Sequence, residues 1–366
     1  MQEPLTIAAG FQVPGRPVEG VRYGSGHIHQ TWVVRHETGD PFPRSVLQRL
    51  NTEVFRDPGA VMTNLLRVTQ HLRERLVAAG ASDLERRVLT PLPHRDGGYL
   101  HQDRGGGLWR CFRFVEGTSS YDTPRGARHA TEAARAFGRF VAALSDLPPG
   151  ELVETIPHFH DLEKRSRDLL QAADADVCDR AERVRRELDR AMEGHALLTR
   201  TLEKEGATAL PRRCVHNDCK INNVLMDDRS GEGLCVIDLD TVMGGSVLCD
   251  FGDLVRTAAC PAPEDEVDLE RMHVDEELLA ALVDGYRRGT GDLLEEVERA
   301  LLPLAGPLLT LEIAIRFLTD HVSGDVYFRV HRPGHNLDRA RAQLHLFDLL
   351  MKRVDQTRTL LTRDSP

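Results

Sequence analysis

The residues best suited to chemistry lie in one polar loop and at the end of the strand pair that follows it. The loop, residues 216–223, reads HNDCKINN and contains the carboxylate of Asp218 and the amide of Asn223. Two short apolar runs come next, joined by a turn rich in Asp, Gly and Ser, and the second run ends on Asp238. A hairpin of this kind can bring the loop acid and the strand-end acid to one edge.

These groups suit phosphoryl transfer. The reaction needs a carboxylate beside the attacking hydroxyl, and hard oxygen ligands that hold Mg²⁺ on the nucleotide phosphates. Asp218 can act as the base, while Asn223 and Asp238 can supply a neutral and a charged metal ligand. The alternative is a polar loop that only caps and solvates the hairpin. The pattern H-x-D-x-x-x-x-N before an apolar strand ending in I-D is specific enough to favour the chemical interpretation.

Three neighbouring residues also need an interpretation. Asp250 begins the sequence Asp-Phe-Gly, which spells a metal-binding motif, but it opens an apolar segment with helical spacing. We therefore expect Asp250 at a helix N-cap and expect Asp238 to bind the metal. Lys220 can neutralise charge on the transferred phosphoryl group or be an ordinary exposed lysine, and the sequence leaves both open. Cys219 is expected to be a packing residue, because no His-Asp relay points to a nucleophile there.

Composition restricts the class of protein. The chain has 366 residues, enough for two domains or lobes, and a net charge of -10, which argues against a nucleic-acid partner. Its seven cysteines form no C-x-x-C pair and are odd in number, so we expect reduced thiols in a cytoplasmic protein. The N-terminus lacks a signal-peptide pattern, and the most apolar segment, 300–315, is interrupted by prolines and a glutamate. We therefore expect no membrane partner.

Residues 20–50 predict three strands that can position a nucleotide. Two of them flank the turn Gly24-Ser25-Gly26, whose tip can approach phosphates closely. The third strand, 45–50, carries Arg49. This arginine can hold phosphates bidentately, or it can be a plain surface residue.

One helix and more strands follow. The helix starts at Asp57-Pro58, and its apolar residues recur at spacings of three and four. Strands return over 87–117, and the segment 114–117, which contains Glu116, is expected to be a hinge whose backbone groups bind an adenine. No G-x-x-x-x-G-K-[ST] sequence occurs, so a Walker-type nucleotide site is excluded.

Beyond residue 117 the pattern is mainly helical. Helices are expected over 129–144, 174–205, 269–288 and 337–361, and one or two helices over 292–322. Residues 158–161, HFHD, lack a third partner at metal-ligand spacing, so we interpret them as an ordered loop that can line an acceptor cleft. The segment 316–328 contains Arg316 and Tyr327 and is either an acceptor pocket or a capped helix end with surface charges.

Five stretches, spread over residues 24–328, resemble one enzyme family: HNDCKINNVL, VIDLDTVMGGSVLCDFGD, GSGHIHQTW, VLQRLNTEVFRDP and RFLTDHVSGDVYF. They are similar to the aminoglycoside phosphotransferase-like kinases, which share the protein-kinase fold, and within these to the N-acetylhexosamine 1-kinases. The resemblance implies a two-lobe α+β fold. A small antiparallel β lobe with one helix, residues 1–117, would bind the nucleotide, and a larger, mainly helical lobe, residues 118–366, would carry catalysis and sugar binding.

The resemblance also implies the reaction, in which ATP and Mg²⁺ phosphorylate the anomeric C1 hydroxyl of GlcNAc or GalNAc. The sugar would contact His27, Asp218, Arg316 and Tyr327. The nucleotide would contact Gly24, Ser25, Gly26, Arg49 and Glu116, with Arg49 in the place of the usual kinase lysine. In that family the aspartate of the Ile-Asp sequence at the strand end, here Asp238, binds the metal. The later aspartate of the Asp-Phe-Gly sequence, here Asp250, is structural.

Alternatives remain at this stage. One is a kinase of another small acceptor such as an aminoglycoside, for which the acidic net charge is suitable but not decisive. The other is a nucleotide-binding pseudokinase, although competent residues occupy the base and metal positions. Glu74, the expected acidic partner of the strand cation, comes late in its helix, which leaves that ion pair open. The sequence predicts no oligomeric state.

Overall fold

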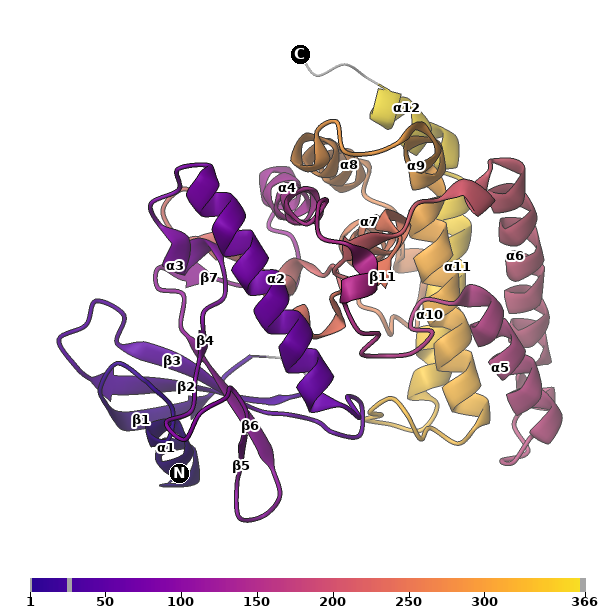
Figure 1. The fold of residues 1–366 in the computed structure, drawn as a ribbon. Coiled ribbons are helices and arrows are strands. Elements are labelled where there is room, and N and C mark those ends of the chain that lie inside the picture. The colour runs from indigo at the N-terminus through magenta and orange to yellow at the C-terminus, as the bar shows by residue number, and fades with distance from the viewer. Residues whose placement is uncertain (1, 25–27, 363–366) are drawn as a thin grey trace. The chain divides into compact units, whose positions relative to one another are not determined.

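The computed structural model describes residues 2–24 and 28–362, and the chain forms two compact units (Figure 1). The first unit contains Met1–Ser119, Asp146–Pro157 and Leu225–Met243, and the second contains the remaining residues. The first combines a sheet with a few helices, and the second is mainly helical. The two units are described in turn.

The first unit is built on an antiparallel sheet in the order β1-β2-β3-β6-β4, with β5 paired to β6. The strands are β1 Arg16–Arg22, β2 Gln30–Glu37, β3 Arg44–Arg49, β4 Pro91–Leu92, β5 His101–Gln102 and β6 Leu108–Arg113. Register pairs Trp32 with Leu47 and Leu47 with Cys111, so these apolar side chains share one face. Helix α1, Gln2–Ala9, which the sequence interpretation did not include, supplies Ala8 to the core on that face.

Two helices of this unit follow β3 and precede β4. Helix α2, Pro58–Ala78, begins as predicted, because the Asp57 side chain accepts a hydrogen bond of 2.9 Å from the Ala60 N–H and Pro58 takes the first helical position. It buries Val61, Leu65 and Val68. Helix α3, Leu84–Arg87, is short and lies where a strand was expected to start.

Two later segments belong to the first unit, which the predicted division at residue 117 did not anticipate. Side-chain bonds over long sequence distances hold them there. The Asn64 side chain donates to the Val153 carbonyl at 2.8 Å, and Arg86 pairs with Asp227 at 2.7 Å. The second segment contains β9, Val224–Asp227, and β10, Gly233–Val236, which form the predicted hairpin and extend to β7, Thr118–Ser119.

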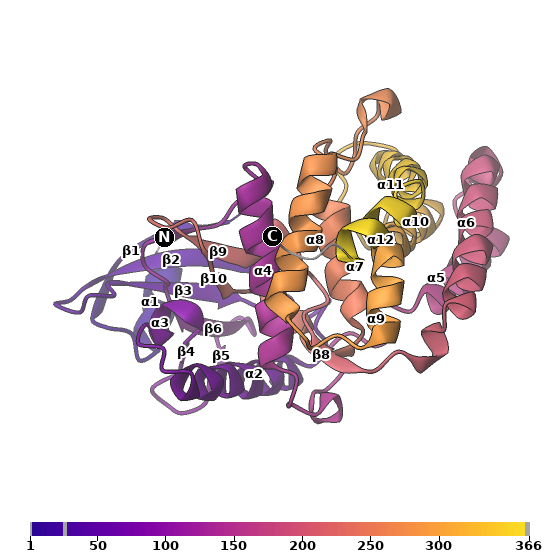
Figure 2. The ribbon, with the colours of Figure 1, turned by 90° about the horizontal axis from the view of Figure 1, so that it is seen from above.

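The second unit is a helical assembly. Its helices are α4 Ala127–Ala143, α5 Leu162–Ala175, α6 Arg185–Lys204, α7 Val247–Ala258, α8 Glu276–Thr290, α9 Glu296–Leu301, α10 Ala305–Val322, α11 His335–Met351 and α12 Val354–Thr362. Two short strands, β8 Arg213–Val215 and β11 Met243–Gly245, pair with each other. Helices α4 and α8 lie side by side (Figures 1 and 2). Their close approach requires glycine, because a Cβ at Gly138 would lie 2.6 Å from the Tyr286 carbonyl oxygen.

The region 174–205 differs from the single helix that was predicted. Helix α5 ends at Ala175 and is followed by the C-cap residue Asp176, whose φ of 35° is left-handed, and α6 begins only at Arg185. The Asp176 carboxylate accepts hydrogen bonds from the N–H groups of Arg180 and Ala181, which stabilises the turn and ends the first helix.

Helix α10 forms the centre of the second unit. Within the described residues, the stretch Glu296–Val322 is long and apolar enough to cross a membrane by length and composition alone. In the protein 89% of its apolar window is buried. The α7 and α11 helices pack against α10, so it has the surroundings of a core helix.

Candidate active site

The polar loop of the second unit connects β8 to a short 3₁₀ turn, Ile221–Asn223. The Asn223 side-chain amide donates to the Asp218 carbonyl oxygen at 2.9 Å and to its carboxylate at 3.1 Å. The buried His216 ring anchors the start of the loop against Phe137 and Phe140. Because the side-chain nitrogen of Asn223 faces Asp218, the side-chain oxygen can serve as a metal ligand. Oxygen is the ligand atom that Mg²⁺ prefers.

The Asp218 carboxylate is held ionised. Burial raises its pKa, but the charge and hydrogen bond of Lys220, whose Nζ lies 2.6 Å from Oδ1, outweigh burial and hold the pKa below its ordinary value. The carboxylate is one quarter exposed, so a small acceptor can reach it. An ionised, partly accessible carboxylate can accept a proton from a hydroxyl. Lys220 is therefore part of the site, and its effect on the phosphoryl group stays a prediction.

Asp250 has a different place from the one predicted. The N-cap of α7 is Ser246, whose hydroxyl accepts from the Leu248 N–H, and Asp250 lies one turn further in. The fully buried Asp250 carboxylate accepts hydrogen bonds from the backbone N–H groups of His216 at 3.0 Å and Asn217 at 2.7 Å. Burial raises its pKa. Asp250 thus holds the loop that precedes Asp218 and does not cap the helix, and the assignment of the metal to Asp238 instead of Asp250 stays a prediction.

Cys219 packs as predicted. Its side chain is fully buried, and burial raises the pKa of the thiol well above its ordinary value. A thiol held protonated in this way is a poor nucleophile.

Asp238 belongs to the first unit and follows β10. Its backbone is left-handed, with φ of 61°, at the start of the turn Leu239–Thr241. This conformation is uncommon for a residue other than glycine and persists where the surroundings fix it. Its carboxylate oxygens are of the type that Mg²⁺ binds.

A buried ion pair fixes that turn. Arg110 of β6 donates two hydrogen bonds to the Asp240 carboxylate, at 2.6 and 2.9 Å, and His29 lies 2.7 Å from the same group. Arg110 and Asp240 are each only 2% exposed. Burial raises the pKa of Asp240, but Arg110 and His29 outweigh it and hold the pKa well below its usual range. The segment that carries Asp238 is thus tied to the central sheet.

Arg49 does not occupy the expected place. Register pairs Arg49 with Trp109 and Gln48 with Arg110, and successive side chains of a strand point to opposite faces. Arg49 therefore lies on the face away from Arg110 and Asp240. It sits over the Trp109 ring, 5.9 Å from its centroid. This placement disfavours Arg49 in the role of the kinase lysine, whereas Arg110 contacts the segment that carries Asp238 through Asp240.

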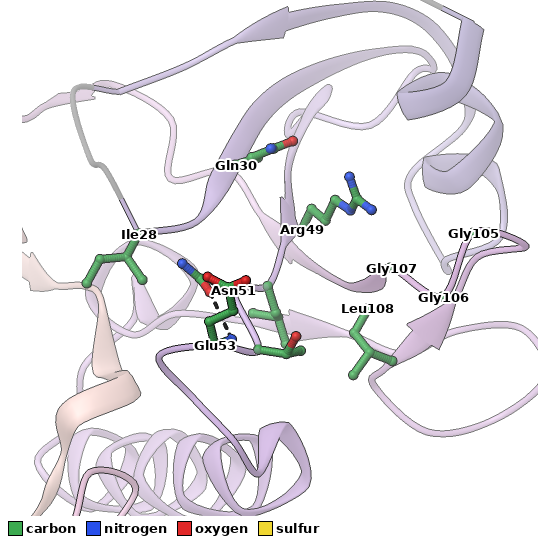
Figure 3. A pocket seen from close by; sticks show the side chains of 11 residues that line it. Ile28, Gln30, Arg49, Asn51, Glu53, Gly105, Gly106, Gly107 and Leu108 are labelled. Atoms are coloured by element: carbon green, nitrogen blue, oxygen red, sulfur yellow. Dashed lines mark hydrogen bonds between the residues drawn. The ribbon is translucent and has the colours of Figure 1, made fainter. Parts of the chain in front are cut away.

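A cavity of about 380 Å³ lies in the first unit beside Arg49 (Figure 3). Ile28, Asn51 and Glu53 line one part of it, and the turn Gly105–Gly107 lines another. Ile28 follows the predicted phosphate-binding turn. Within that turn Gly24 has φ of 83°, as a tight turn requires, while Ser25, Gly26 and His27 lie outside the described residues, so their nucleotide and sugar contacts stay predictions.

The predicted hinge is held at several points. The Arg44 Nε donates to the Glu116 carboxylate at 3.1 Å, and Arg86 donates to the Glu116 carbonyl at 3.0 Å. A carbonyl oxygen has two lone pairs and can accept a second bond. The contact of Glu116 with an adenine stays a prediction.

The two predicted acceptor residues of the second unit lie together. The Arg316 guanidinium carbon is 5.9 Å from the ring centroid of the exposed Tyr327, and 5.3 and 5.5 Å from those of Phe159 and Phe328. The Asp320 carboxylate holds this segment by accepting hydrogen bonds from the N–H groups of residues 326–328 at 2.7–2.9 Å. Sequence reasoning missed Phe159 and Phe328 as members of this cluster, although both lie in stretches that it singled out.

Comparison with known proteins places these features in a family. The model of the phosphotransferase enzyme family matches residues 19–297. The chain therefore belongs to the phosphotransferase enzyme family.

Solved structures share the fold. A microcompartment-associated aminopropanol kinase is 18% identical with a TM-score of 0.60, over 97% of this chain and 98% of that one. An aminoglycoside phosphotransferase from Alicyclobacillus acidocaldarius is 13% identical with a TM-score of 0.61, over 97% and 95%. A spectinomycin phosphotransferase in complex with ADP and spectinomycin is 10% identical with a TM-score of 0.57, over 98% and 97%. These likenesses confirm the predicted kinase-like α+β fold, with an antiparallel sheet in the N-terminal part and helices in the C-terminal part.

Because Arg49 and Arg110 lie on opposite faces of the sheet, their replacement should change the free energy of unfolding by different amounts. Replacing Arg110 with Ala leaves the Asp240 charge buried without its bidentate partner, so the free energy of unfolding should fall by about 3–5 kcal/mol. Replacing the partly exposed Arg49 with Ala should cost less than about 1 kcal/mol. Urea denaturation of both variants measures the difference, and a larger loss for Arg49→Ala would contradict the described roles.

Proposed function

We propose that this phosphotransferase is an ATP-dependent sugar 1-kinase. It transfers the γ-phosphoryl group to the anomeric C1 hydroxyl of GlcNAc or GalNAc and releases the sugar 1-phosphate and ADP. The observation that carries the proposal is the partly exposed carboxylate of Asp218, contacted by Asn223 and Lys220, in the same unit as Arg316 and Tyr327. The resemblance of both segments to the N-acetylhexosamine 1-kinases selects the acceptor.

In this mechanism Asp218 accepts the proton of the C1 hydroxyl. The sugar oxygen then forms its bond to the γ-phosphorus while the bond between that phosphorus and the bridging oxygen of ADP breaks. Positioning by the enzyme makes the attack effectively unimolecular. Asn223 and Asp238 would hold Mg²⁺, which supplies charge neutralisation on the phosphates. Lys220 is suited to compensate negative charge near the transferred group.

The nucleotide is proposed to be ATP. A related fold binds ADP in the spectinomycin phosphotransferase complex, which supports an adenine nucleotide. Gly24, Ser25 and Gly26 are proposed to approach the phosphates, and the hinge segment around Glu116 to bind the adenine. Arg49 is not carried forward in this role because of the face on which it lies.

A second candidate function is a kinase of a cationic acceptor. The names of the structural neighbours, an aminopropanol kinase and aminoglycoside phosphotransferases, favour it. Arg316, Phe159, Tyr327 and Phe328 form the predicted acceptor cluster. This cluster disfavours a cationic acceptor, because Arg316 already places a positive charge among the three rings. A cationic amine would meet like charge there, whereas sugar hydroxyls and an acetamide carbonyl can accept hydrogen bonds from a guanidinium. A pseudokinase is disfavoured because the base and the candidate metal ligands are all present.

The proposed setting is the cytoplasm. None of the seven cysteines forms a disulfide and six of them are buried, which suits a reducing compartment. The proposed partners are the sugar and the nucleotide, with neither nucleic acid nor membrane.

The acceptor cluster provides a kinetic test. Arg316→Ala should raise the KM for GlcNAc and GalNAc about 5- to 150-fold, because hydrogen bonds to a ligand are costly to lose, about 1–3 kcal/mol each. The KM for ATP should change little. The exposed Arg329→Ala is the control and should behave as the unmodified protein. Steady-state kinetics with each substrate varied in turn measures this, and an effect confined to ATP would contradict the proposed acceptor site.

A further inference from the structure

Phe159 of the loop 158–161 belongs to the acceptor cluster, and the next residue, His160, contacts the polar loop 216–223, here called the catalytic loop. The His160 Nε2 lies 2.9 Å from the carbonyl oxygen of Asn217, the residue immediately before Asp218. On the other side of the ring, Nδ1 lies 3.1 and 3.2 Å from the two carboxylate oxygens of Glu312 on α10. The His160 side chain is 8% exposed and that of Glu312 is 1% exposed.

The partners of this ring define its protonation. A backbone carbonyl and a carboxylate are both acceptors, so both ring nitrogens must donate, and only the imidazolium has two N–H groups. Burial lowers the pKa of His160, but the charge and hydrogen bonds of Glu312 and the Asn217 carbonyl outweigh it and raise the pKa above its ordinary value. Arg316 on α10 opposes this rise. Arg165 on α5 donates to the Phe159 carbonyl beside His160, and Asp161, which follows His160, pairs with His158 at 3.3 Å.

The residue that His160 contacts is conformationally unusual. Asn217 has φ of 64°, and Asp250 accepts a hydrogen bond from its N–H at 2.7 Å. The peptide groups around Asn217 are therefore fixed from both sides, by Asp250 through the N–H and by His160 through the carbonyl. Such a left-handed residue persists only where its surroundings stabilise it, and its orientation sets the direction of the Asp218 side chain that follows.

The same loop also contacts the acceptor cluster. The Phe159 ring packs at a tilt of 41° against the His160 ring, with centroids 4.3 Å apart, and its centroid lies 5.3 Å from the Arg316 guanidinium carbon. Arg165 donates to the carbonyls of His158 and Phe159, both at 3.0 Å, and so fixes the loop backbone. One short loop thus touches both the base segment and the acceptor cluster.

We propose that His160, held as an imidazolium by Glu312, is a positioning residue that fixes the Asn217 peptide and thereby aims the Asp218 carboxylate at the acceptor. The inference rests on the proposed role of Asp218 and does not depend on which acceptor is used. When His160 loses a proton, one nitrogen lone pair must face either the Glu312 carboxylate or the Asn217 carbonyl. Either arrangement is repulsive, and the catalytic loop is released.

The sign of the pH effect follows from the raised pKa. The stabilisation is fully present below the unfolded value of about 6.5 and is lost as pH rises through the higher folded value. We therefore expect kcat to fall on the alkaline side while the affinity for ATP stays constant. In Glu312→Gln the amide can donate to Nδ1, so a neutral His160 keeps its Nε2–H on Asn217. This variant should remain active and lose the alkaline fall that His160 causes.

The experiment measures acceptor-dependent ADP release against pH for the unmodified protein, His160→Ala, His160→Gln and Glu312→Gln, with ATP binding by calorimetry. His160→Ala should lower kcat about 10- to 100-fold, as a misplaced catalytic group does, with KM for ATP unchanged. His160→Gln, whose amide can donate to Asn217, should recover part of the loss. The control is His158→Asn, an exposed neighbour with φ of 54°, at which Asn tolerates the left-handed backbone.

Two results would overturn the inference: a kcat for His160→Ala equal to that of the control, or an unchanged alkaline fall in Glu312→Gln. Should His160→Ala not fold, the pH profiles of the unmodified protein and Glu312→Gln decide alone. Failure of the proposed function is distinguishable, because it would show as turnover retained by Asp218→Asn. If hexosamines were not phosphorylated but another alcohol were, the same profiles would be measured with that acceptor.

Discussion

Asp218→Asn is expected to lower kcat by about 10²–10⁴-fold, the usual loss for removal of a general base. Asparagine has nearly the same shape and can still accept the hydrogen bond from Lys220, but it cannot take the proton of the attacking hydroxyl. The affinity for Mg·ATP should stay nearly constant because the carboxylate acts on the acceptor. Initial rates at saturating substrates and calorimetric ATP binding measure the two effects separately.

A matched control is available nearby. Asp122 is exposed and accepts a hydrogen bond from the Asn222 side chain at 3.0 Å. Asp122→Asn makes the same chemical change at a carboxylate with no proposed role and should leave kcat within about twofold, as for an ordinary surface substitution. If Asp218→Asn kept more than a tenth of the original rate, Asp218 would not be the base.

The second large effect concerns Asp250. Alanine at this position leaves the buried N–H groups of His216 and Asn217 without their acceptor. Each buried unsatisfied group costs about 1–3 kcal/mol, so the free energy of unfolding should fall by about 2–6 kcal/mol and kcat should fall with it as the loop loosens. Removal of the true N-cap in Ser246→Ala should cost only about 1 kcal/mol.

Asp238→Ala tests the predicted metal ligand independently of Asp250, which holds the loop before Asp218. We expect its activity to collapse while the melting temperature stays close to that of the unmodified protein. Thermal denaturation and Mg²⁺-dependent turnover are measured for Asp238→Ala, Asp250→Ala and Ser246→Ala and compared. A stable Asp250→Ala that cannot use Mg·ATP, beside an active Asp238→Ala, would mean that the metal ligand is Asp250.

Local signals in the sequence predicted the elements well. Asp57-Pro58 starts a helix because the cap and the proline act within a few residues, and the strand pair after Asn223 follows from its turn. The break at Asp176 was missed because a left-handed residue other than glycine leaves little trace in the sequence. Asp250 was placed at the helix start on spacing alone, although Ser246, four residues earlier, is an equally suitable cap by chemistry.

Long-range pairing could not be predicted from the sequence. Arg110 and Asp240 are 130 positions apart, and neither belongs to a motif that predicts the other. Strand alternation alone would have placed Arg49 and Gln48 on opposite faces of the sheet, but it does not predict which face contacts the carboxylate of Asp240. The contact of His160 with Asn217 spans 57 positions and joins a loop to a loop, for which no periodicity exists.

The central claim is that the anomeric hydroxyl of an N-acetylhexosamine is the nucleophile. The most direct measurement is ³¹P and ¹H NMR of the products from GlcNAc, GalNAc and their methyl glycosides, with kanamycin as the competing acceptor. We predict a phosphorus coupled to the anomeric proton for both free sugars and no phosphorylation of either methyl glycoside, in which C1 is blocked. Phosphate on O3 or O6, a phosphorylated methyl glycoside, or phosphorylation of kanamycin alone would contradict the account.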